Sequence, residues 1–257
     1  MKDIRAIGFD LFNTLIFAKE GALREATSRL TDSLIQNGLD FEPHRFRDLY
    51  TDAVKRHLLN AQKTGIETHN RFWISDALRR MGIRLNPFHR IISDAVDAYF
   101  SAFFIYCTPI PSAIEILQEL RSKFSLGLLT NFTDPYVARQ LIERLGLYNL
   151  FDVIIISGQI GYRKPHPITF RYLIDLLKVD ETQILFVGDD LGPDIMGAQR
   201  SGIQPVWMTY VIDNNIPSQI PRSDPNDFPN LAHLPRVSQL DDLIILIEEI
   251  SSGKETH

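Results

Sequence analysis

The sequence predicts an α/β fold: a doubly wound, Rossmann-like parallel sheet with an all-helical segment inserted after its first strand. From Thr108 onward, short apolar runs alternate with stretches of helical periodicity, as expected when crossover helices join parallel strands. Before that point a single apolar run, Ile4 to Asp10, is followed by residues 19–105, which hold few strand-like runs. Because one isolated strand cannot bury itself, it must join the later sheet.

The inserted stretch is expected to form four packed helices. Apolar residues recur there at helical spacing, and Gly38, Gly65, Gly82 and Pro87 separate the segments. The four segments are Ala22 to Leu34, Phe46 to Leu58, Phe72 to Met81 and Ile91 to Phe103. We therefore predict two domains: an α/β core made of residues 1–17 and 106–257, and a helical domain over residues 18–105.

The rest of the core is expected to alternate helices and strands. Proline is tolerated in the first turn of a helix, so Pro109 and Pro111 predict a helix that runs through Arg121. The strands that follow are expected at residues 126–130, 153–157, 184–187 and 205–208, and the helices at 135–145, 167–177 and 194–201. Residues 213–235, rich in Pro, Asn, Asp and Ser, predict a long surface loop before a last strand at 236–238 and a helix at 240–250.

Composition excludes several classes of function. The chain has 257 residues, 44% of them hydrophobic, which suffices for a packed core. A net charge of −5 without a long basic run disfavours nucleic-acid binding. Cys107 is the only cysteine, which excludes an intramolecular disulfide and a Cys-based zinc cluster. With no signal-like core and no apolar run of membrane-spanning length, we expect a cytoplasmic monomer or homodimer that acts on a small molecule, without membrane or nucleic-acid partners.

Polar side chains follow four of the predicted strands. Parallel strands bring their carboxyl ends to one edge of a sheet, where α/β proteins bind ligands. Each residue alone has an ordinary explanation as a turn, a helix cap or a surface lysine, and their joint occurrence at strand ends makes those explanations improbable. The residues are Asp10, Thr130 with Asn131, Lys164, and the group Asp189, Asp190 and Asp194.

These residue types favour phosphoryl transfer. Several carboxylates without a histidine partner suit a hard cation such as Mg²⁺. Lys164 can offset phosphate charge, Thr130 can bind anionic oxygens, and Asp10 can attack phosphorus.

The same residues resemble the haloacid dehalogenase-like (HAD) hydrolase superfamily, in subfamily I, whose members carry a helical C1 cap. The first motif, DxDxT, is matched by Asp10 and Thr14 but not at its second Asp, where Phe12 stands. Thr130 matches the second motif and Lys164, before a proline, the third. Gly188, Asp189 and Asp194 match the fourth, GDxxxxD.

The resemblance implies a role for each position. Asp10 would be the nucleophile, Thr130 would orient the phosphoryl oxygens, and Lys164 would balance charge. Asp189 would bind Mg²⁺ together with Asp10 and the main-chain carbonyl of Phe12. Asp190 and Asp194 would hold these ligands in place without binding the metal themselves. Thr14 and Asn131 would contact substrate.

Phe12 leaves the reaction open among three alternatives. Phosphatases of the family use an Asp at this position as general acid and base, which Phe12 cannot replace. Our first hypothesis is a Mg²⁺-dependent phosphatase for a small phosphorylated metabolite, acting through an aspartyl-phosphate. The second is a 2-haloacid dehalogenase, because halide leaves without a proton, and the third is a non-catalytic protein that binds a phosphorylated ligand.

Overall fold

The computed structural model of the chain describes residues 3–217, 222–228 and 233–252, and is built on a parallel six-stranded sheet. Its strand order is β5-β4-β1-β6-β7-β8. This confirms the predicted fold class, with the first strand of the chain inside the later sheet. The strands are β1 (Ala6–Phe9), β4 (Ser125–Thr130), β5 (Val153–Ile156), β6 (Ile184–Gly188), β7 (Gln204–Met208) and β8 (Arg236–Val237).

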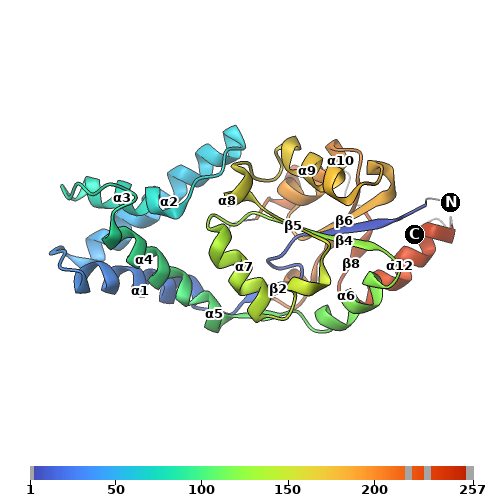
Figure 1. The fold of residues 1–257 in the computed structure, drawn as a ribbon, viewed down its shortest axis with the longest axis horizontal. Coiled ribbons are helices and arrows are strands. Elements are labelled where there is room, and N and C mark those ends of the chain that lie inside the picture. Colours follow the sequence, from blue (N-terminus) through green and yellow to red (C-terminus); the bar gives the residue numbers. More distant parts are fainter. Residues whose placement is uncertain (1–2, 218–221, 229–232, 253–257) are drawn as a thin grey trace.

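Helices cover both faces of the sheet, as Figure 1 shows. Helices α9 (Pro167–Leu177) and α10 (Gly197–Arg200) lie on one face, and α6 (Ala113–Arg121), α7 (Pro135–Arg144) and α12 (Asp241–Ser252) belong to the other. Side chains of β1 alternate between these layers: Ile7 and Phe9 pack with the α6 and α7 side, and Ala6 packs with the α9 side. The alternation explains why β1 is fully buried and apolar on both faces.

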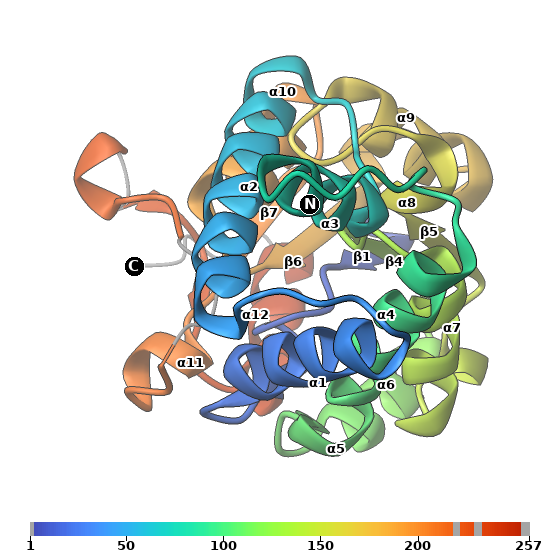
Figure 2. The same cartoon turned by 90° about the vertical axis from the view of Figure 1, so that its left-hand side faces the viewer.

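The inserted residues form a helical unit beyond the carboxyl ends of the strands (Figures 1 and 2). As predicted, this unit has four main helices: α1 (Ala22–Gln36), α2 (Pro43–Thr64), α3 (Asn70–Arg80) and α4 (Arg90–Ser101). Helix α1 packs against α4, and α2 packs against α3. A single turn, α5 (Phe103–Tyr106), leads back to the core.

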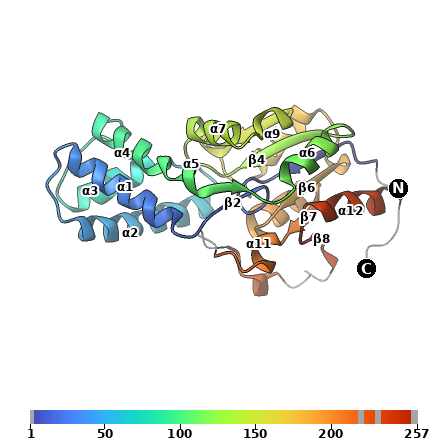
Figure 3. The ribbon, with the colours of Figure 1, turned by 90° about the horizontal axis from the view of Figure 1, so that it is seen from below.

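A short antiparallel ribbon joins the helical unit to the core (Figure 3). It pairs β2 (Ile16–Ala18) with β3 (Cys107–Pro109), and the sequence analysis missed both strands. The predicted helix start at Pro109 is wrong, because Cys107–Pro109 is extended and paired, and α6 begins at Ala113. The ribbon lies near the two predicted domain boundaries, between residues 17 and 18 and between residues 105 and 106. The division into two domains stays a prediction.

Other differences lie at element ends and in connections. The helix predicted at 194–201 begins earlier, as a wide turn η3 (Leu191–Met196), because the Asp190 side chain accepts a hydrogen bond from Gly192 N. Short helices α8 (Ser157–Ile160), α11 (Tyr210–Asp213) and η4 (Pro225–Asp227) were not predicted. Parts of the expected 213–235 loop, residues 218–221 and 229–232, lie outside the described residues.

Among the helices of the described ranges, none combines the length and the apolar character needed to cross a bilayer.

Candidate active site

Asp10 stands directly after β1, at the centre of the sheet edge that faces the helical unit. Its main-chain N–H donates to Val187 O of the neighbouring strand at 2.9 Å, which fixes where the side chain leaves the sheet. The carboxylate is buried and has a partner on each oxygen. Lys164 Nζ lies 2.6 Å from Oδ1, and the Thr14 hydroxyl donates to Oδ2 at 3.3 Å. Asp10 is thus held in one orientation by a cation and a hydroxyl.

Lys164 reaches Asp10 from the loop that follows β5 and α8. Asn131, directly after β4, grips the main chain of Lys164 twice: its Oδ1 accepts from Lys164 N at 2.8 Å, and its Nδ2 donates to Lys164 O at 3.0 Å. The Lys164 ammonium is buried between two carboxylates, 2.6 Å from Asp10 Oδ1 and 2.7 Å from Asp194 Oδ1. Asn131 therefore positions the lysine, and its predicted contact with substrate stays a prediction.

Three acidic residues follow β6. Asp189 is buried, and its main-chain carbonyl accepts a hydrogen bond from Trp207 Nε1 at 3.0 Å. Asp194 lies on the first turns of η3, and its Oδ2 accepts from Asp190 N at 3.0 Å. Asp190 faces away from the cluster, with Oδ1 bonded to Gly192 N and Ser223 N at 3.2 Å each. The wide turn η3 thus brings the Asp194 carboxylate back to the main chain of Asp190, directly after Asp189.

The carboxylates form a group that could hold a metal ion. Ligand atoms of Asp10, Asp189 and Asp194 lie within 4.8 Å of one another, and all three residues are buried. Asp189 Oδ2 is buried without a hydrogen bond from any described residue. A buried carboxylate oxygen in that state is costly unless a cation or a donor reaches it. Three buried carboxylates in one place, one of whose oxygens has only a 3.1 Å charge contact with Arg222 Nε and no hydrogen bond, fit a hard divalent cation with oxygen ligands.

Burial and mutual repulsion dominate the electrostatics of this cluster. Burial raises the pKa of Asp10 to about 6, although Lys164 opposes the shift. Burial, with the charges of Asp194 and Asp10, raises the pKa of Asp189 well above its ordinary value. Burial alone would lower the pKa of the Lys164 ammonium, but Asp10 and Asp194 leave it raised above its usual value. The site therefore holds more negative charge than its lysine neutralises.

Phe12 lies in an aromatic cluster. Its ring stacks on Phe132 with centroids 5.9 Å apart and meets the edge of Phe103 at 6.2 Å. Phe100 of α4 stacks on the same Phe132 at 5.2 Å. Phe12 and Phe132 come from the core, and Phe100 and Phe103 from the helical unit. The side chain at the position of the expected acid thus packs the two parts of the protein together.

Comparison with known proteins identifies the family. A sequence model of the haloacid dehalogenase-like hydrolases matches residues 4–202, which include all the motif residues described above. The chain belongs to the haloacid dehalogenase-like hydrolases. This confirms the resemblance that the four motifs predicted.

Named relatives extend the comparison. The chain is 31% identical to the glyceraldehyde 3-phosphate phosphatase of Pyrococcus abyssi over 208 residues, 80% of this chain and 82% of the relative. It is 32% identical to the enzyme of that name from Methanopyrus kandleri over 201 residues, 78% and 82% of the two chains. A solved 2-haloacid dehalogenase from Pseudomonas syringae has the same fold, with a TM-score of 0.69 at 20% identity, covering 96% of this chain and 99% of that one.

In this hydrolase, the helical unit touches the core through the connection between α2 and α3. Glu67 is central: Ser157 Oγ donates to its Oε2 at 2.7 Å, and its N–H donates to Gly161 O at 2.9 Å. His69 Nε2 lies 3.0 Å from Asp134 Oδ2, at the start of α7. Because Ser157 begins α8 and Gly161 directly follows it, this connection contacts the stretch that leads to Lys164.

Two residues beside the carboxylates, Arg222 and Ser223, were not predicted from the sequence. Arg222 Nε lies 3.1 Å from Asp189 Oδ2, and Ser223 Oγ accepts from Gly192 N at 3.1 Å. Both belong to the segment predicted as a long loop. A single arginine among prolines and aspartates has no periodicity or motif spacing, so nothing in the sequence could assign it to the site.

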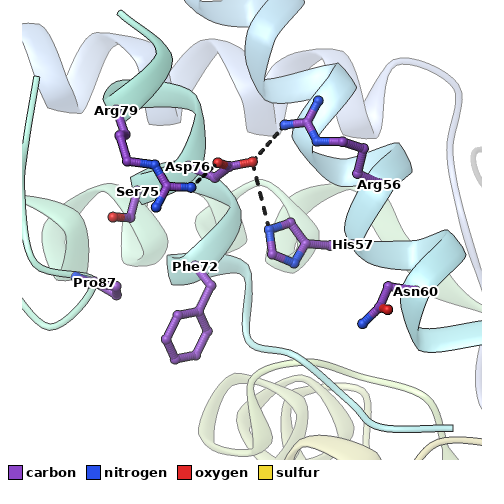
Figure 4. A pocket seen from close by; sticks show the side chains of 8 residues that line it. All are labelled: Arg56, His57, Asn60, Phe72, Ser75, Asp76, Arg79 and Pro87. Atoms are coloured by element: carbon purple, nitrogen blue, oxygen red, sulfur yellow. Dashed lines mark hydrogen bonds and ion pairs between the residues drawn. The ribbon is translucent and has the colours of Figure 1, made fainter. Parts of the chain in front are cut away.

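A cavity of about 420 Å³ in the helical unit, between α2 and α3, is separate from this chemistry (Figure 4). Asp76 lies at its wall and binds Arg56 Nη2 and Arg79 Nη2, each at 2.6 Å. The motif residues Asp10, Thr130, Lys164 and Asp189 are not among those that line it. The candidate active site of this hydrolase is therefore the carboxylate cluster at the sheet edge.

Proposed function

We propose that this hydrolase is a Mg²⁺-dependent phosphatase that acts on a small phosphorylated metabolite through an aspartyl-phosphate on Asp10. The observation that carries the proposal is the buried Asp10 carboxylate, 2.6 Å from Lys164 and grouped with Asp189 and Asp194. The names of the two relatives, both phosphatases that cover about four fifths of the chain, support the same reaction class.

Asp10, Asp189 and the main-chain carbonyl of Phe12 would hold the Mg²⁺ ion. Asp189 Oδ2 supports this assignment, because it is buried and has a charge contact with Arg222 Nε at 3.1 Å but no hydrogen bond among the described residues. When bound, the ion supplies positive charge that offsets the phosphate oxygens and orients the group for displacement. Asp194 would keep Lys164 and the Asp190 main chain in place, as its two contacts suggest.

The proposed reaction has two displacements at phosphorus. A carboxylate oxygen of Asp10 attacks phosphorus, the ester P–O bond breaks, and the substrate oxygen leaves with the bonding pair. A water molecule then attacks the same phosphorus and the bond to Asp10 breaks. The Asp10 carboxylate is restored, inorganic phosphate leaves with the water oxygen, and the proton that the water loses passes to solvent. Lys164 offsets the charge of the phosphoryl group throughout. Thr130 would bind a phosphoryl oxygen, and Thr14 keeps Asp10 oriented by its hydroxyl.

Phe12 shapes the expected substrate preference. A phenyl ring cannot protonate the leaving oxygen, so that proton must come from water. Loss of a positioned general acid costs about 10²–10⁴ in rate for leaving groups that need a proton. Substrates whose leaving group is already a weak base lose least. Aryl phosphates should therefore be turned over faster than alkyl phosphates.

The decisive test is metal dependence with an aryl phosphate. Phosphate release from 4-nitrophenyl phosphate should fall about 10³-fold after metal removal, because a bound cation contributes several kcal/mol of charge stabilisation. Added MgCl₂ should restore the activity. Phosphate release can be followed as absorbance of the nitrophenolate product, with thermal unfolding as the control for intact fold. Equal turnover in the metal-stripped protein would contradict the proposal.

Phe12 also favours one competing function, dehalogenation, because halide leaves without a proton. Halide release from 2-haloacids that persists in chelator would support it. Against it stands the carboxylate cluster: without a metal ion, Asp189 and Asp194 would repel an ionised Asp10, so that less of this residue would be in the charged form that attacks. Ligand binding without any turnover of either substrate class would instead support a non-catalytic protein.

Gly188, at the end of β6, gives a sharper test of how the site is positioned. A Cβ added there would lie 2.5 Å from Asp194 Cγ, so Asp194 would have to move. Gly188→Ala should lower kcat about tenfold or more, with a stability loss of about 1–3 kcal/mol from overpacking.

Gly127→Ala is the matched control, because its Cβ would meet the Leu173 side chain in the α9 layer, on another strand. It should cost similar stability and leave kcat near the wild-type value. Steady-state kinetics and thermal unfolding of both variants measure the two effects. Equal losses of kcat in the two variants would show that overpacking alone, and not Asp194, is responsible.

A further inference from the structure

We propose that Arg222 is a functional member of the metal centre, where it pairs with Asp189 and competes with the divalent cation for that carboxylate. The inference rests on the proposed Mg²⁺ dependence and goes beyond it, because Arg222 belongs to none of the four motifs. Arg222 Nε lies 3.1 Å from Asp189 Oδ2, the same oxygen that has no hydrogen bond from a described residue.

The contact of Arg222 with Asp189 is a charge contact without a hydrogen bond. Arg222 Nε and Nη2 are both buried, and neither finds a hydrogen-bond acceptor among the described residues. The side chain is only 19% exposed, and that of Asp189 only 8%. An arginine that serves only to hold two segments together usually forms two parallel hydrogen bonds with a carboxylate. Here neither Nε nor Nη2 has an acceptor among the described residues, so the pairing with Asp189 is a single charge contact that another cation can replace.

Neighbouring contacts hold Arg222 at the site. Ser223 N donates to Asp190 Oδ1 at 3.2 Å, and Ser223 Oγ accepts from Gly192 N at 3.1 Å. Asp190 and Gly192 belong to the same turn after β6 that presents Asp189. The segment with Arg222 is therefore anchored to the acidic turn by the residue next to the arginine. This anchoring can persist while the Arg222 side chain moves away from Asp189.

Charge in the cluster predicts the direction of the effect. Asp10, Asp189 and Asp194 face two cations, Lys164 and Arg222. Lys164 is already paired with the other two carboxylates, because its ammonium lies 2.6 Å from Asp10 and 2.7 Å from Asp194. A metal ion bound to Asp189 Oδ2 would share that oxygen with the Arg222 guanidinium. Two positive charges at such a distance repel, so Arg222 lowers the affinity of the centre for Mg²⁺.

The experiment is a calorimetric titration of the full-length, metal-free protein with MgCl₂ alone. Arg222→Gln removes the charge and keeps much of the length, and it should bind Mg²⁺ about tenfold more tightly than the wild type, the effect of one nearby charge at a partly screened site. Arg222→Lys keeps the charge and should bind with nearly the wild-type affinity. Thermal unfolding without metal shows that each variant is folded.

Arg121→Gln is the matched control for loss of one positive charge. Arg121 ends α6, and its guanidinium lies 3.9 Å from Asp152. Asp152 precedes β5, so this pair lies at the amino ends of the strands, whereas the carboxylate cluster lies at their carboxyl ends. Its Mg²⁺ affinity should equal that of the wild type. If Arg121→Gln tightened binding as much as Arg222→Gln, general charge and not the Asp189 contact would be responsible, and the inference would be overturned.

The remaining outcomes separate this inference from the proposed function. Unchanged or weaker Mg²⁺ binding in Arg222→Gln, with binding to the wild type intact, overturns the role of Arg222 and leaves the metal-dependent phosphatase standing. Tighter binding in both Arg222→Gln and Arg222→Lys would assign the effect to side-chain shape and also overturn it. Absence of Mg²⁺ binding in every variant would overturn the proposed metal dependence, and the inference with it.

Discussion

Asp10→Asn should abolish phosphate release, lowering kcat by about 10⁴-fold or more, because the residual rate without a nucleophile comes from binding alone. An amide oxygen is a poor nucleophile, and the variant cannot form the aspartyl-phosphate. The fold should persist, since Lys164 keeps its 2.7 Å contact with Asp194 and is not left as an unpaired buried charge. Release of phosphate from 4-nitrophenyl phosphate in MgCl₂ measures the loss.

The pH dependence of stability provides a second measurement on the same variant, in metal-free buffer. Burial raises the pKa of Asp10 from 3.8 to about 6, so the folded state favours the neutral carboxyl. That contribution is fully present below pH 3.8 and is lost as the pH rises through about 6. Asp10→Asn has no such group, so its stability relative to wild type should increase between these pH values, by up to about 3 kcal/mol.

Asp94→Asn on α4 is the matched control for Asp10→Asn. Asp94 is half-buried in the helical unit, and its carboxylate lies 3.8 Å from Arg90 Nε within the same helix. This variant should retain wild-type turnover and show no stability gain across that pH range. Substantial phosphate release by Asp10→Asn, at the Mg²⁺ concentration used for the wild type, would rule out Asp10 as the nucleophile.

Lys164→Met should lower both activity and stability. Without the ammonium, Asp10 and Asp194 face each other across its place, with Arg222 as the remaining cation beside Asp189. Removal of one partner from a buried charge network costs about 3–5 kcal/mol of unfolding free energy. Loss of the charge opposite the phosphoryl group should lower kcat about 10²–10³-fold. Chemical denaturation and steady-state kinetics measure the two effects.

Lys123→Met controls for the loss of a lysine. Lys123 is exposed, with its ammonium 3.3 Å from Glu119 one helical turn away, and its removal should change stability by less than about 1 kcal/mol. Lys164→Arg keeps the charge but needs more room, so it should recover part of the stability and less of the turnover. If Lys164→Met turned over the aryl phosphate as fast as wild type, the lysine would have no part in the reaction.

The sequence predicted much of the sheet because its strands are short, apolar and bounded by helical patterns. Their common edge followed from topology: parallel strands must bring residues after β1, β5 and β6 together, so Asp10, Lys164 and Asp189 could be grouped without coordinates. The roles assigned to these residues remain predictions. The β2 and β3 strands were missed because three residues each carry no usable periodicity, and their pairing links positions far apart in the chain.

The finer arrangement of the site depended on contacts that no pattern records. Asn131 is expected to contact substrate, and no pattern indicated that both ends of its amide bind the main chain of Lys164. Arg222 reaches the carboxylates, and Glu67 reaches the stretch before Lys164, from segments without motif spacing. Their partners, Asp189 and Ser157, lie far away in the sequence. Side chains of this kind are placed by tertiary packing, which a single sequence does not display.

The position of β1 at the centre of the sheet has a consequence for synthesis of the chain. Ala6 pairs with Ser125 of β4 on one side and with Ile184 of β6 on the other. During translation, β1 therefore cannot pair on both sides until residues up to β6 have been synthesised. The helices α1 to α4, which lie between β1 and β4 in the chain, can form their local contacts first. Such long-range pairing slows folding. A nascent chain stalled before Ser125 would leave β1, the apolar strand that leads to Asp10, without either neighbour.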